Sequence, residues 1–478
     1  MENFDLLVIG SGSGLNVANC VANRGRSVAV IEKGSVGGTC LNRGCIPSKE
    51  LLYHADVYQT VERASEFNIS ASVHEVDFAD IVRGVNEDVS ADANSIRNGL
   101  QSSPQHELFE GDARFVDDKT IEIVDGTDDG VRLGAESILI ATGSRPSIPD
   151  IAGINNIDYL TSTDALQLQT PPDHLIIVGG GFVAAEFGHF FGTFGSDVTI
   201  IGRQPTLLPQ VDEDIAEAFT NRFSNRCTVH TGYVATAVIE QNGMITVDAR
   251  RSEYGDEPEI FSGDTVTVTG DELLVAAGRK PNSDTLNLDA TSVETDESGF
   301  IKTDEYLRTD ADGVWALGDI VGKYMFKHTA NYEAKTVANN ILDTDRRTVD
   351  YSAMPFAVFT SPEVAGVGAC EEELRLQDRE YATSTSEYKE SARGQAMNAT
   401  GFIKVLVDLE GRILGCHIIG PEASTLIQEV VVAMQSCSGT VHDIRGTVHI
   451  HPALPEVVKH AFSGQFRPGD TIRQRQRD

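Results

Sequence analysis

Short apolar runs that end in glycine-rich turns dominate the hydrophobic pattern along this chain. Residues 6–9 (LLVI) and 174–178 (HLIIV) are two such runs, and each leads through a glycine turn into a helical pattern. A short apolar run that is bounded by turn signals predicts a buried strand. The sequence therefore predicts two strand–turn–helix units, which are typical of the α/β fold class.

The remaining pattern alternates between helical and extended stretches. Helical periodicity occupies residues 51–100 and 327–341. Alternating or apolar patterns that predict strands occupy residues 106–135, 137–146 and 228–275. Mixed strands and helices follow from residue 355 to Phe466, after which the chain is polar and Arg-rich. With 478 residues the chain is too long for one hydrophobic core, so about three domains are expected.

The charge balance is strongly acidic. Asp and Glu number 72 against 38 Lys and Arg, which gives a formal net charge of −34. Nucleic acids and anionic membranes bind basic patches, so the composition argues against both as partners. The acidic runs 212–214 and 371–373 are expected in loops or helix starts, spread over the surface. This composition resembles halophilic proteins of salt-rich cytoplasm, where screening weakens self-repulsion, and a merely acidic mesophile protein is the alternative.

Neither a membrane span nor a signal peptide is expected. The chain has no apolar run of the ~18 residues that a spanning helix needs, and its first ten residues enter a strand directly. A cytoplasmic protein is therefore expected, and its seven cysteines do not indicate a framework of structural disulfides. Five scattered cysteines are expected to be inert core residues: Cys20, Cys227, Cys370, Cys416 and Cys437.

The other two cysteines lie in the segment GGTCLNRGCIPSK, residues 37–49. On a regular helix Cys40 and Cys45 would be roughly 8–9 Å apart between Cα atoms. A disulfide needs less than about 7 Å, so a bridged pair requires a distorted helix start. The flanking glycines would permit the distortion: Gly37, Gly38 and Gly44. Thiols at a helix N-terminus are reactive, but a structural disulfide or two buried thiols would fit the spacing alone.

The whole segment resembles the redox-active disulfide segment of the flavin-dependent pyridine nucleotide–disulfide oxidoreductases. The resemblance extends over residues 4 to about 465 and implies two Rossmann-like dinucleotide-binding domains, for FAD and NAD(P), plus a C-terminal α+β dimerisation domain. We assign residues 1–150 and 281–350 to the FAD domain and 151–280 to the NAD(P) domain. Residues 351–466 are assigned to the dimerisation domain and 467–478 to a tail. A homodimer is implied.

The first glycine turn carries the expected FAD site. Gly10 and Gly12 match the first two glycines of the dinucleotide fingerprint, whereas Leu15 stands at the third, with Gly14 one place early. The packing of the helix on the strand is therefore expected to differ slightly. Glu32 ends the next strand, where a carboxylate should meet the ribose hydroxyls. The resemblance assigns further FAD contacts to Gly38, Thr39, Ala141, Thr142, Gly143 and Asp319.

The second glycine turn is expected to bind the nicotinamide cofactor. Gly179, Gly181 and Ala184 match its fingerprint, and Phe182 matches the residue over the nicotinamide pocket, where a Tyr is usual. Arg203 stands just beyond the end of the next strand and would attract a 2′-phosphate, so NADPH is expected rather than NADH. A solvated surface Arg is the alternative. The resemblance adds Gly278 and Arg279 to this site.

The resemblance also implies the catalytic residues. Cys40 and Cys45 would form the redox-active disulfide, with Cys45 as the thiolate beside the flavin and Cys40 as the residue that attacks the substrate. Glu186 would pair with Lys49 near the flavin, although each could instead be a separate surface charge. In HPALPE, Glu456 would orient His451, which would act as the proton donor from the other subunit. His449 is expected to be structural.

The expected activity is FAD-dependent reduction of a small thiol disulfide by NADPH. Glutathione reductases place an arginine where Cys20 stands here, whereas Lys335 matches a basic residue that grips a substrate carboxylate in this family. This combination and the halophile-like composition favour bis-γ-glutamylcystine, with mycothione as the sister candidate. An NAD-dependent dihydrolipoamide dehydrogenase is the alternative. Mercuric reductase is disfavoured because no cysteine follows Cys437, and no metal site is expected.

Overall fold

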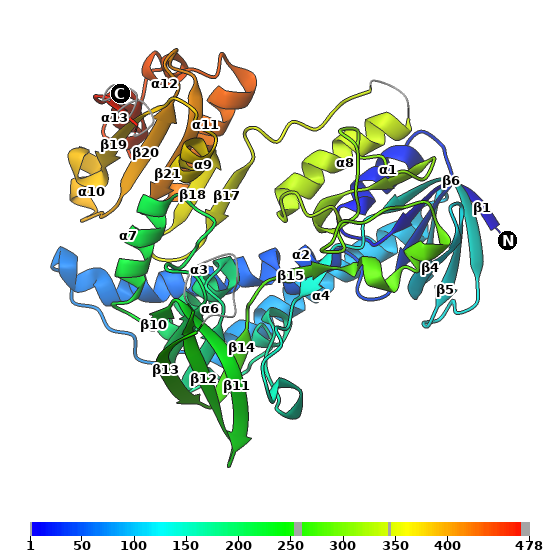
Figure 1. Ribbon diagram of the computed structural model, residues 1–478, viewed down its shortest axis with the longest axis horizontal. Helices are drawn as coiled ribbons and strands as arrows, with labels where there is room; N and C mark the ends of the chain where they lie inside the picture. The colour runs from blue at the N-terminus through cyan, green and yellow to red at the C-terminus, as the bar shows by residue number, and fades with distance from the viewer. Residues whose placement is uncertain (1, 253–260, 343–345, 470–478) are drawn as a thin grey trace.

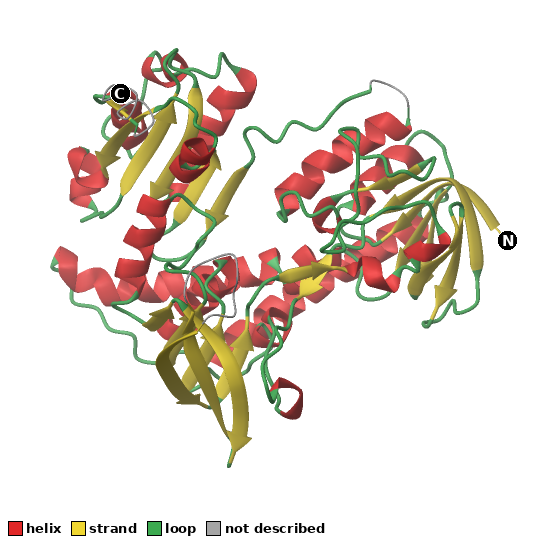
Figure 2. Cartoon of the chain, in the orientation of Figure 1, coloured by secondary structure: helices red, strands yellow, loops and turns green. Residues whose placement is uncertain are grey.

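The computed structural model describes residues 2–252, 261–342 and 346–469. The chain forms three parts, each built on its own sheet or sheets (Figures 1 and 2). The first and second parts contain parallel strands, whereas the third is an antiparallel sheet with helices. The expected fold class, two Rossmann-like domains plus a C-terminal α+β domain, is confirmed.

The first part is a sheet in the order β3-β2-β1-β6-β5-β4, with β16 also paired to β6. Its strands are β1 (Glu2–Ile9), β2 (Val28–Glu32), β3 (His106–Glu110), β4 (Asp112–Asp117), β5 (Thr120–Val124), β6 (Arg132–Ile140) and β16 (Val314–Ala316). β1 pairs in parallel with β2 and β6, and Leu6 to Ile9 are almost completely buried because both faces are covered. Since β16 comes from late in the chain, the second part is an insertion into the first.

Two helices, α1 (Gly14–Ala22) and α8 (Lys327–Ile341), pack on one face of this sheet (Figure 1). The buried side chains of α1 recur at Val17 and Val21, and those of α8 at Ala334 and Val337. This 3.6-residue spacing places one apolar stripe of each helix on the sheet. The N-terminus of each helix therefore lies near the glycine turn that follows β1.

The second part has a parallel sheet, β10-β9-β8-β14, and an antiparallel sheet, β11-β12-β13. The strands are β8 (His174–Val178), β9 (Asp197–Gly202), β10 (Thr228–Thr231), β11 (Tyr233–Gln241), β12 (Met244–Ser252), β13 (Phe261–Gly270) and β14 (Glu272–Val275). Its helices are α5 (Ser162–Ala165), α6 (Phe182–Thr193) and α7 (Glu213–Phe223). A ribbon of β7 (Ser144–Pro146) and β15 (Arg279–Pro281) connects the first and second parts.

The third part is a six-stranded antiparallel sheet, β17-β18-β21-β20-β19-β22. The strands are β17 (Pro355–Val358), β18 (Val364–Gly368), β19 (Ala382–Glu387), β20 (Phe402–Val407), β21 (Ile413–Ile419) and β22 (Arg467–Pro468). The helices are α9 (Glu371–Leu376), α10 (Ala392–Ala396), α11 (Ala423–Ser436), α12 (Val441–Arg445) and α13 (Pro455–Ser463). β22 comes from the segment expected to be a tail, and the rest of that segment, 470–478, lies outside the described residues.

Three helices lead away from the first glycine turn: α2 (Gly38–Arg43), α3 (Cys45–Glu62) and α4 (Phe78–Ser102). The helical prediction for residues 51–100 is confirmed except at 68–77. α3 packs on both α4 and α6, so it connects the first part with the second. Among the described residues, no helix is long and apolar enough to cross a membrane.

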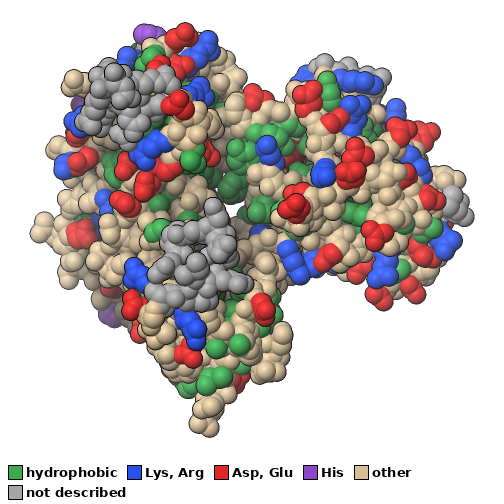
Figure 3. All heavy atoms as spheres, viewed as in Figure 1, with side chains coloured by type: hydrophobic (Ala, Val, Ile, Leu, Met, Phe, Trp, Pro, Cys, Tyr) green, Lys and Arg blue, Asp and Glu red, His purple; other side chains and the backbone are tan. Residues whose placement is uncertain are grey.

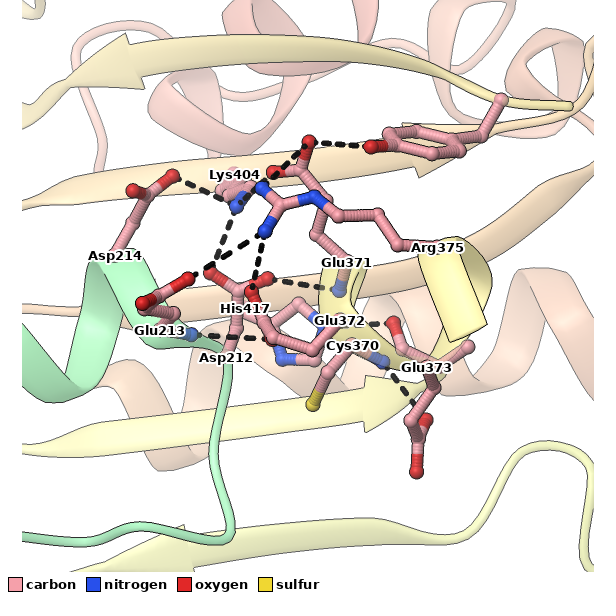
Figure 4. A network of polar contacts seen from close by, with 12 residues as sticks. Asp212, Glu213, Asp214, Cys370, Glu371, Glu372, Glu373, Arg375, Lys404 and His417 are labelled. Carbon is pink, nitrogen blue, oxygen red and sulfur yellow. Dashed lines mark hydrogen bonds and ion pairs between the residues drawn. The ribbon is translucent and has the colours of Figure 1, made fainter. Parts of the chain in front are cut away.

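A buried ion network joins the second part to the third (Figure 4). Lys404 on β20 is 2% exposed, and its ammonium lies 2.8 Å from Asp212, 2.7 Å from Asp214 and 2.6 Å from Glu371. Asp212 precedes α7, whereas Glu371 begins α9, so the carboxylates come from both parts. Both acidic runs lie at helix starts, as expected, but the expectation that they are spread over the surface is wrong for Asp212 and Glu371, whose side chains are 0% and 12% exposed. They converge because a desolvated ammonium needs carboxylate partners.

Candidate active site

The cysteine pair lies where one helix breaks into two. Gly44 separates α2 from α3 with φ −147° and ψ −119°. A Cβ at this position would lie 2.9 Å from the Thr39 carbonyl oxygen and 3.3 Å from the Cα of Cys40. The expected distortion is confirmed: Cys40 lies in α2 and Cys45 begins α3. Both are free thiols, Cys40 half-buried and Cys45 exposed.

The two thiols differ in acidity. A hydrogen bond from Cys40 and, against the effect of burial, the charge of Lys49 lower the pKa of Cys45 to about 6. The same hydrogen bond, together with burial, raises the pKa of Cys40, and the charge of Lys327 only partly counteracts this. Near neutral pH the reduced pair therefore holds one negative charge on Cys45, while Cys40 keeps its proton.

Lys49 and Glu186 form an ion pair directly behind the cysteines. Lys49 Nζ lies 2.7 Å from Glu186 Oε2, and the Glu186 side chain is only 11% exposed. The other oxygen, Oε1, accepts a hydrogen bond of 3.1 Å from the backbone N–H of Phe359. The Phe359 ring also lies 5.2 Å from the ammonium. The pair thus fixes α3, α6 and the third part relative to one another.

The first glycine turn is packed so closely that side chains are excluded from it. A Cβ on Gly10, which has φ +98°, would lie 2.5 Å from the Ala141 carbonyl oxygen, and one on Gly38 would lie 2.6 Å from the Cα of Gly12. A Cβ on Gly14 would lie 2.7 Å from Val8. Gly14 therefore permits the close helix–strand approach that the fingerprint gives to its third glycine.

Other residues predicted for FAD lie around this turn. Glu32 accepts hydrogen bonds from both the N–H and the hydroxyl of Ser11, which fixes the carboxylate at the end of β2. Thr142 Oγ1 is buried and has no hydrogen-bond partner in the described structure. Gly143 has φ +66°, and Thr39 lies in the first turn of α2. The exposed backbone of the turn and the orphaned hydroxyl of Thr142 fit a bound dinucleotide.

The structure places Arg279 with the residues predicted for FAD, although the sequence suggested the nicotinamide cofactor. Its guanidinium donates to Ser144 Oγ at 2.7 Å and to the Ser144 carbonyl at 2.8 Å. Ser144 in turn donates to Asp319 at 2.6 Å, and Asp319 lies 3.7 Å from Arg279. These contacts hold Asp319 in place at the short helix η5 (Gly318–Ile320).

The second glycine turn has the same geometry. Gly179 has φ +138°, and a Cβ there would lie 2.2 Å from the Ala276 carbonyl oxygen, while Ala184 is completely buried. Gly181 precedes α6, whose N-terminal N–H groups suit a pyrophosphate. Arg203 is exposed just after β9. Gly278, with φ +129°, lies between β14 and β15. These features fit a second dinucleotide.

Phe182, at the start of α6, lies in an aromatic stack. Its ring centroid is 6.0 Å from that of Phe326 and 5.7 Å from that of Phe356, with interplanar angles of 19° and 27°. Phe326 also stacks on His328 at 5.2 Å. The stack therefore contains rings from all three parts of the chain, beside the predicted nicotinamide site.

His451 and Glu456 form a dyad in the third part. His451 Nδ1 lies 2.9 Å from Glu456 Oε1, and the imidazole is 73% exposed. The hydrogen bond to His451 lowers the pKa of Glu456, so the carboxylate stays ionised and fixes the ring. α13, which carries Glu456, is well separated from α2 (Figure 1). Figure 3 shows the molecule hollowed between the third part, which contains α13, and the first part.

Side chains in the loop before His451 alternate between pointing outward and pointing inward. Val448 and Ile450 are 93% and 78% exposed, whereas His449 points inward, with Nε2 3.2 Å from Glu429 and Nδ1 3.0 Å from the Thr447 carbonyl. The structural role expected for His449 agrees with this geometry. Exposed apolar side chains such as those beside the predicted catalytic dyad are typical of an interface that a partner subunit covers.

The structure tests the core prediction for the other cysteines, and it places Cys370 in a half-buried position. Cys227 and Cys416 are buried as expected, but Cys20 and Cys437 are exposed, so the core prediction is wrong for both. Lys335 is exposed on α8, eight residues and therefore roughly 12 Å beyond the helix start. Among the described residues, no group of three or more His, Cys, Asp or Glu side chains is arranged to hold a metal ion.

Lys327, the first residue of α8, is a further candidate that was not predicted from the sequence. Its ammonium donates to Ser13 Oγ at 3.0 Å, and its charge acts on Cys40. One signal was present in the sequence, because a lysine in the first turn of a helix opposes the helix dipole. Its neighbours could not be known, since Ser13 lies 314 residues away in the chain.

Known proteins resemble this chain over nearly its whole length. The chain is 37% identical to a mycothione reductase of Mycobacterium tuberculosis, over 97% of this chain and all of that protein. It is 35% identical to dihydrolipoyl dehydrogenase 3 of Haloarcula marismortui (96% and 95% covered) and 34% identical to a mercuric reductase of Staphylococcus aureus (96% and 82%). The structure of the HOCl-induced flavoprotein disulfide reductase RclA from Escherichia coli superposes with a TM-score of 0.85 at 26% identity, covering 97% and 99%.

Family matches cover nearly all of the chain. Residues 4–334 match the family described as pyridine nucleotide-disulphide oxidoreductase, and residues 354–462 match the dimerisation domain of that family. The dimerisation domain implies a homodimer, and FAD and a pyridine nucleotide are typical of the family. The chain therefore belongs to the pyridine nucleotide-disulphide oxidoreductase family, as a flavoprotein disulfide reductase.

Proposed function

We propose that this protein uses NADPH to reduce a small, cysteine-derived disulfide, with bis-γ-glutamylcystine as the first candidate and mycothione as the second. The cysteine pair is the observation that carries the proposal. Cys45 is ionised near neutral pH, and Cys40 lies half-buried beside it with its proton retained. A dithiol with one low pKa is suited to thiol–disulfide exchange.

FAD, when bound, would supply the redox chemistry that carries a hydride equivalent from the nicotinamide to the Cys40–Cys45 disulfide. Gly10, Gly12 and Gly38 would let its pyrophosphate approach the backbone, and Asp319 would meet its ribityl chain. Lys49, held by Glu186, would keep a positive charge beside Cys45 and so favour its thiolate. These residues act by binding and by electrostatics alone.

The exchange step requires a base, because Cys40 holds a proton in the reduced pair. His451 of the partner subunit would take that proton on Nε2, while Glu456 holds Nδ1. The Cys40 sulfur then attacks one substrate sulfur, forms a mixed disulfide and releases the first thiolate, which takes the proton from His451. The Cys45 thiolate then attacks the Cys40 sulfur of the mixed disulfide and restores the Cys40–Cys45 disulfide. The second half of the substrate leaves as a thiolate, which takes a proton from solvent.

The choice of NADPH rests on Arg203. This side chain is exposed at the end of β9, where the adenosine ribose of a dinucleotide lies in a Rossmann unit. A guanidinium there would bind the 2′-phosphate, whereas a carboxylate would repel it. Arg203→Glu should therefore lower kcat/KM for NADPH by roughly one to two orders of magnitude. An unchanged NADPH/NADH ratio would count against this role.

The choice of substrate rests on two positions. Cys20 stands where glutathione reductases grip a glycine carboxylate, and a thiol cannot make that contact. Lys335 is an exposed cation on α8 that would bind a more distant carboxylate. A relative at 37% identity is a mycothione reductase, which supports a low-molecular-weight thiol disulfide. The acidic composition favours bis-γ-glutamylcystine by association with halophiles.

A panel of disulfides tests the proposal. Purified enzyme would be assayed with NADPH and NADH against bis-γ-glutamylcystine, mycothione, glutathione disulfide and lipoamide, at low and at multimolar salt. We expect tens-fold higher kcat/KM for the first or second disulfide than for glutathione disulfide, because each lost charge-assisted contact costs about 1.5–3 kcal/mol. Preference for NADH and lipoamide would instead indicate a dihydrolipoamide dehydrogenase, an alternative supported by a relative at 35% identity.

A further inference from the structure

Lys327 is a cation for which the described structure supplies no anion. It begins α8, where the helix dipole disfavours a positive charge. In the described part of the chain, no carboxylate oxygen lies within 4.0 Å of its ammonium. An ammonium has three donors, and the one recorded protein acceptor is Ser13 Oγ at 3.0 Å. A half-buried cation in this position is suited to an anionic ligand.

The neighbours of Lys327 form a polar strip between α1 and α8. Ser13 Oγ donates to Asn331 Oδ1 at 3.0 Å, and Asn16 donates to the same oxygen at 2.9 Å. Asn331 lies one turn beyond Lys327, and Lys335 lies one turn beyond Asn331. Since Ser13 uses its proton on Asn331, its oxygen faces the ammonium as an acceptor. Ser13 follows Gly12, and a Cβ on Gly38 at the start of α2 would lie 2.6 Å from the Cα of Gly12. The contacts of Lys327 therefore hold it near the helix that carries Cys40 without neutralising its charge.

We infer that Lys327 binds the α-carboxylate of the substrate cysteine whose sulfur Cys40 attacks. This inference rests on the proposed function, because it concerns the same disulfide. A carboxylate on the carbon next to the reacting CH₂–S group must lie close to Cys40, where Lys327 is the cation that α8 supplies. The enzyme then selects disulfides in which the cysteine carboxylate is free and disfavours those in which it is amidated.

The inference separates the candidate substrates. In bis-γ-glutamylcystine the cysteine carboxylates are free, whereas in glutathione disulfide they are part of a peptide bond to glycine. Lys335, roughly 12 Å along the same helix, would meet the more distant γ-glutamyl carboxylate. Two cations along α8 thus match two carboxylates of one half of the substrate.

The first test pairs a variant with an amidated substrate. Lys327→Gln should lower kcat/KM for bis-γ-glutamylcystine by about tenfold to a hundredfold, mainly through KM, because one charge-assisted contact is lost. With the cysteine carboxylates converted to amides, wild type and variant should differ by less than about twofold. Lys323→Gln is the matched control, since Lys323 is an exposed lysine nearby, against the Tyr351 ring. Equal losses on both substrates would overturn the inference.

The second test needs neither turnover nor a known substrate. In the reduced holoenzyme with Cys45→Ser, Cys40 would be alkylated by iodoacetate or by iodoacetamide, with iodide as the leaving group in both reactions. Only iodoacetate carries a carboxylate next to the reacting carbon. Lys327→Gln should therefore lower the iodoacetate/iodoacetamide rate ratio at Cys40 by about tenfold, measured by mass spectrometry of the peptide.

The two tests distinguish two failures. If Lys327 only favoured the Cys40 thiolate, both alkylation rates would fall together and the ratio would stay constant, which would overturn the inference. If wild-type enzyme reduced none of the disulfides, the proposed function would fail. In that case the alkylation ratio would still report whether Lys327 binds a carboxylate beside Cys40.

Discussion

At the scale of single residues, the acidity of Cys45 depends on two opposite charges. The hydrogen bond from Cys40 has the largest effect on its pKa, and Lys49 lowers that pKa further, whereas Glu186 raises it. Glu186 thus has two opposing effects on Cys45. It holds Lys49 in place by an ion pair, and its negative charge partly cancels the effect of Lys49 on the pKa of Cys45. Substitutions of Lys49 and of Glu186 should therefore shift the pKa of Cys45 in opposite directions.

Lys49→Gln should raise the pKa of Cys45 from about 6 toward its ordinary value of 9.0, and Glu186→Gln should lower it further. The measurement is the pH dependence of thiolate absorbance, or of iodoacetamide labelling at Cys45, in the reduced enzyme. Lys33→Gln is the control, because Lys33 pairs with Asp112 at the surface. Shifts of the same sign in both variants would show that the pair acts through structure rather than charge.

Sequence motifs predicted the side chains of this site better than they predicted its surroundings. Lys49 and Glu186 lie inside motifs that fix their spacing from the cysteines and from the second glycine turn, so their pairing could be expected. Lys327 lies in no such motif, and its importance depends on contacts with Ser13 and Cys40, about 300 residues earlier in the chain. Arg279 illustrates the same limit, because its partners Ser144 and Asp319 are set by the tertiary fold.

At the scale of secondary-structure elements, the break at Gly44 brings the two cysteines together. The sequence indicated that glycines would permit a distorted helix start, but not that α2 and α3 would be separate helices. It also indicated a departure at the first fingerprint, whose third glycine is displaced to Gly14. The structure shows that α1 begins at Gly14 and that a Cβ there would lie 2.7 Å from Val8, so the helix still approaches the strand closely. Element type followed from periodicity, whereas helix ends depended on tertiary packing.

Gly44→Ala should lower the free energy of unfolding by about 1–3 kcal/mol, because the new Cβ would meet the Thr39 backbone at 2.9 Å. The displaced backbone should also raise the pKa of Cys45 by weakening its hydrogen bond from Cys40. Gly84→Ala on α4 is the control, since no atom lies within 4 Å of its Cβ, and it should stabilise the protein by up to about 1 kcal/mol. Thermal unfolding that ranked both variants alike would contradict the argument.

At the scale of the whole molecule, ionic contacts join the second part to the third. Lys404 joins α7 of the second part to α9 of the third through Asp212 and Glu371. Burial opposes the charged form of Glu371, but its hydrogen bond from Lys404 lowers its pKa below the ordinary value. The sequence could not predict this network, because its acidic runs lie about 160 residues apart and resemble solvated surface charge.

Lys404→Met should destabilise the protein by about 3–5 kcal/mol near neutral pH, since it leaves buried carboxylates without a counter-charge. Glu371 and Asp212 have lowered pKa values, so their contribution in wild type is complete above their ordinary values and is lost as pH falls through the lowered ones. The difference in the free energy of unfolding between variant and wild type should therefore shrink below about pH 4. Lys389→Met, at an exposed pair with Glu387, is the control in urea titrations and should change little.

The His451–Glu456 dyad and the cysteines belong to different parts of one chain, so we expect an intact site to require two chains. Cys40 lies in α2, whereas Glu456, the partner of His451, lies in α13, and the two helices are well separated (Figure 1). Val448 and Ile450, next to His451, are exposed in a single chain. A twofold dimer would cover them and bring each dyad to the partner's cysteines.

Mixed dimers test this arrangement. A Cys40→Ser chain and a His451→Gln chain, each nearly inactive as a homodimer, would be co-expressed with different tags and purified as the heterodimer. One of its two sites then combines an intact Cys40 with an intact His451, so about half of the wild-type activity should return. The reciprocal heterodimer, wild type with a chain carrying both substitutions, should be inactive, because each of its sites lacks one group. If His451 instead served the cysteines of its own chain, the first heterodimer would be inactive and the second would keep about half of the activity.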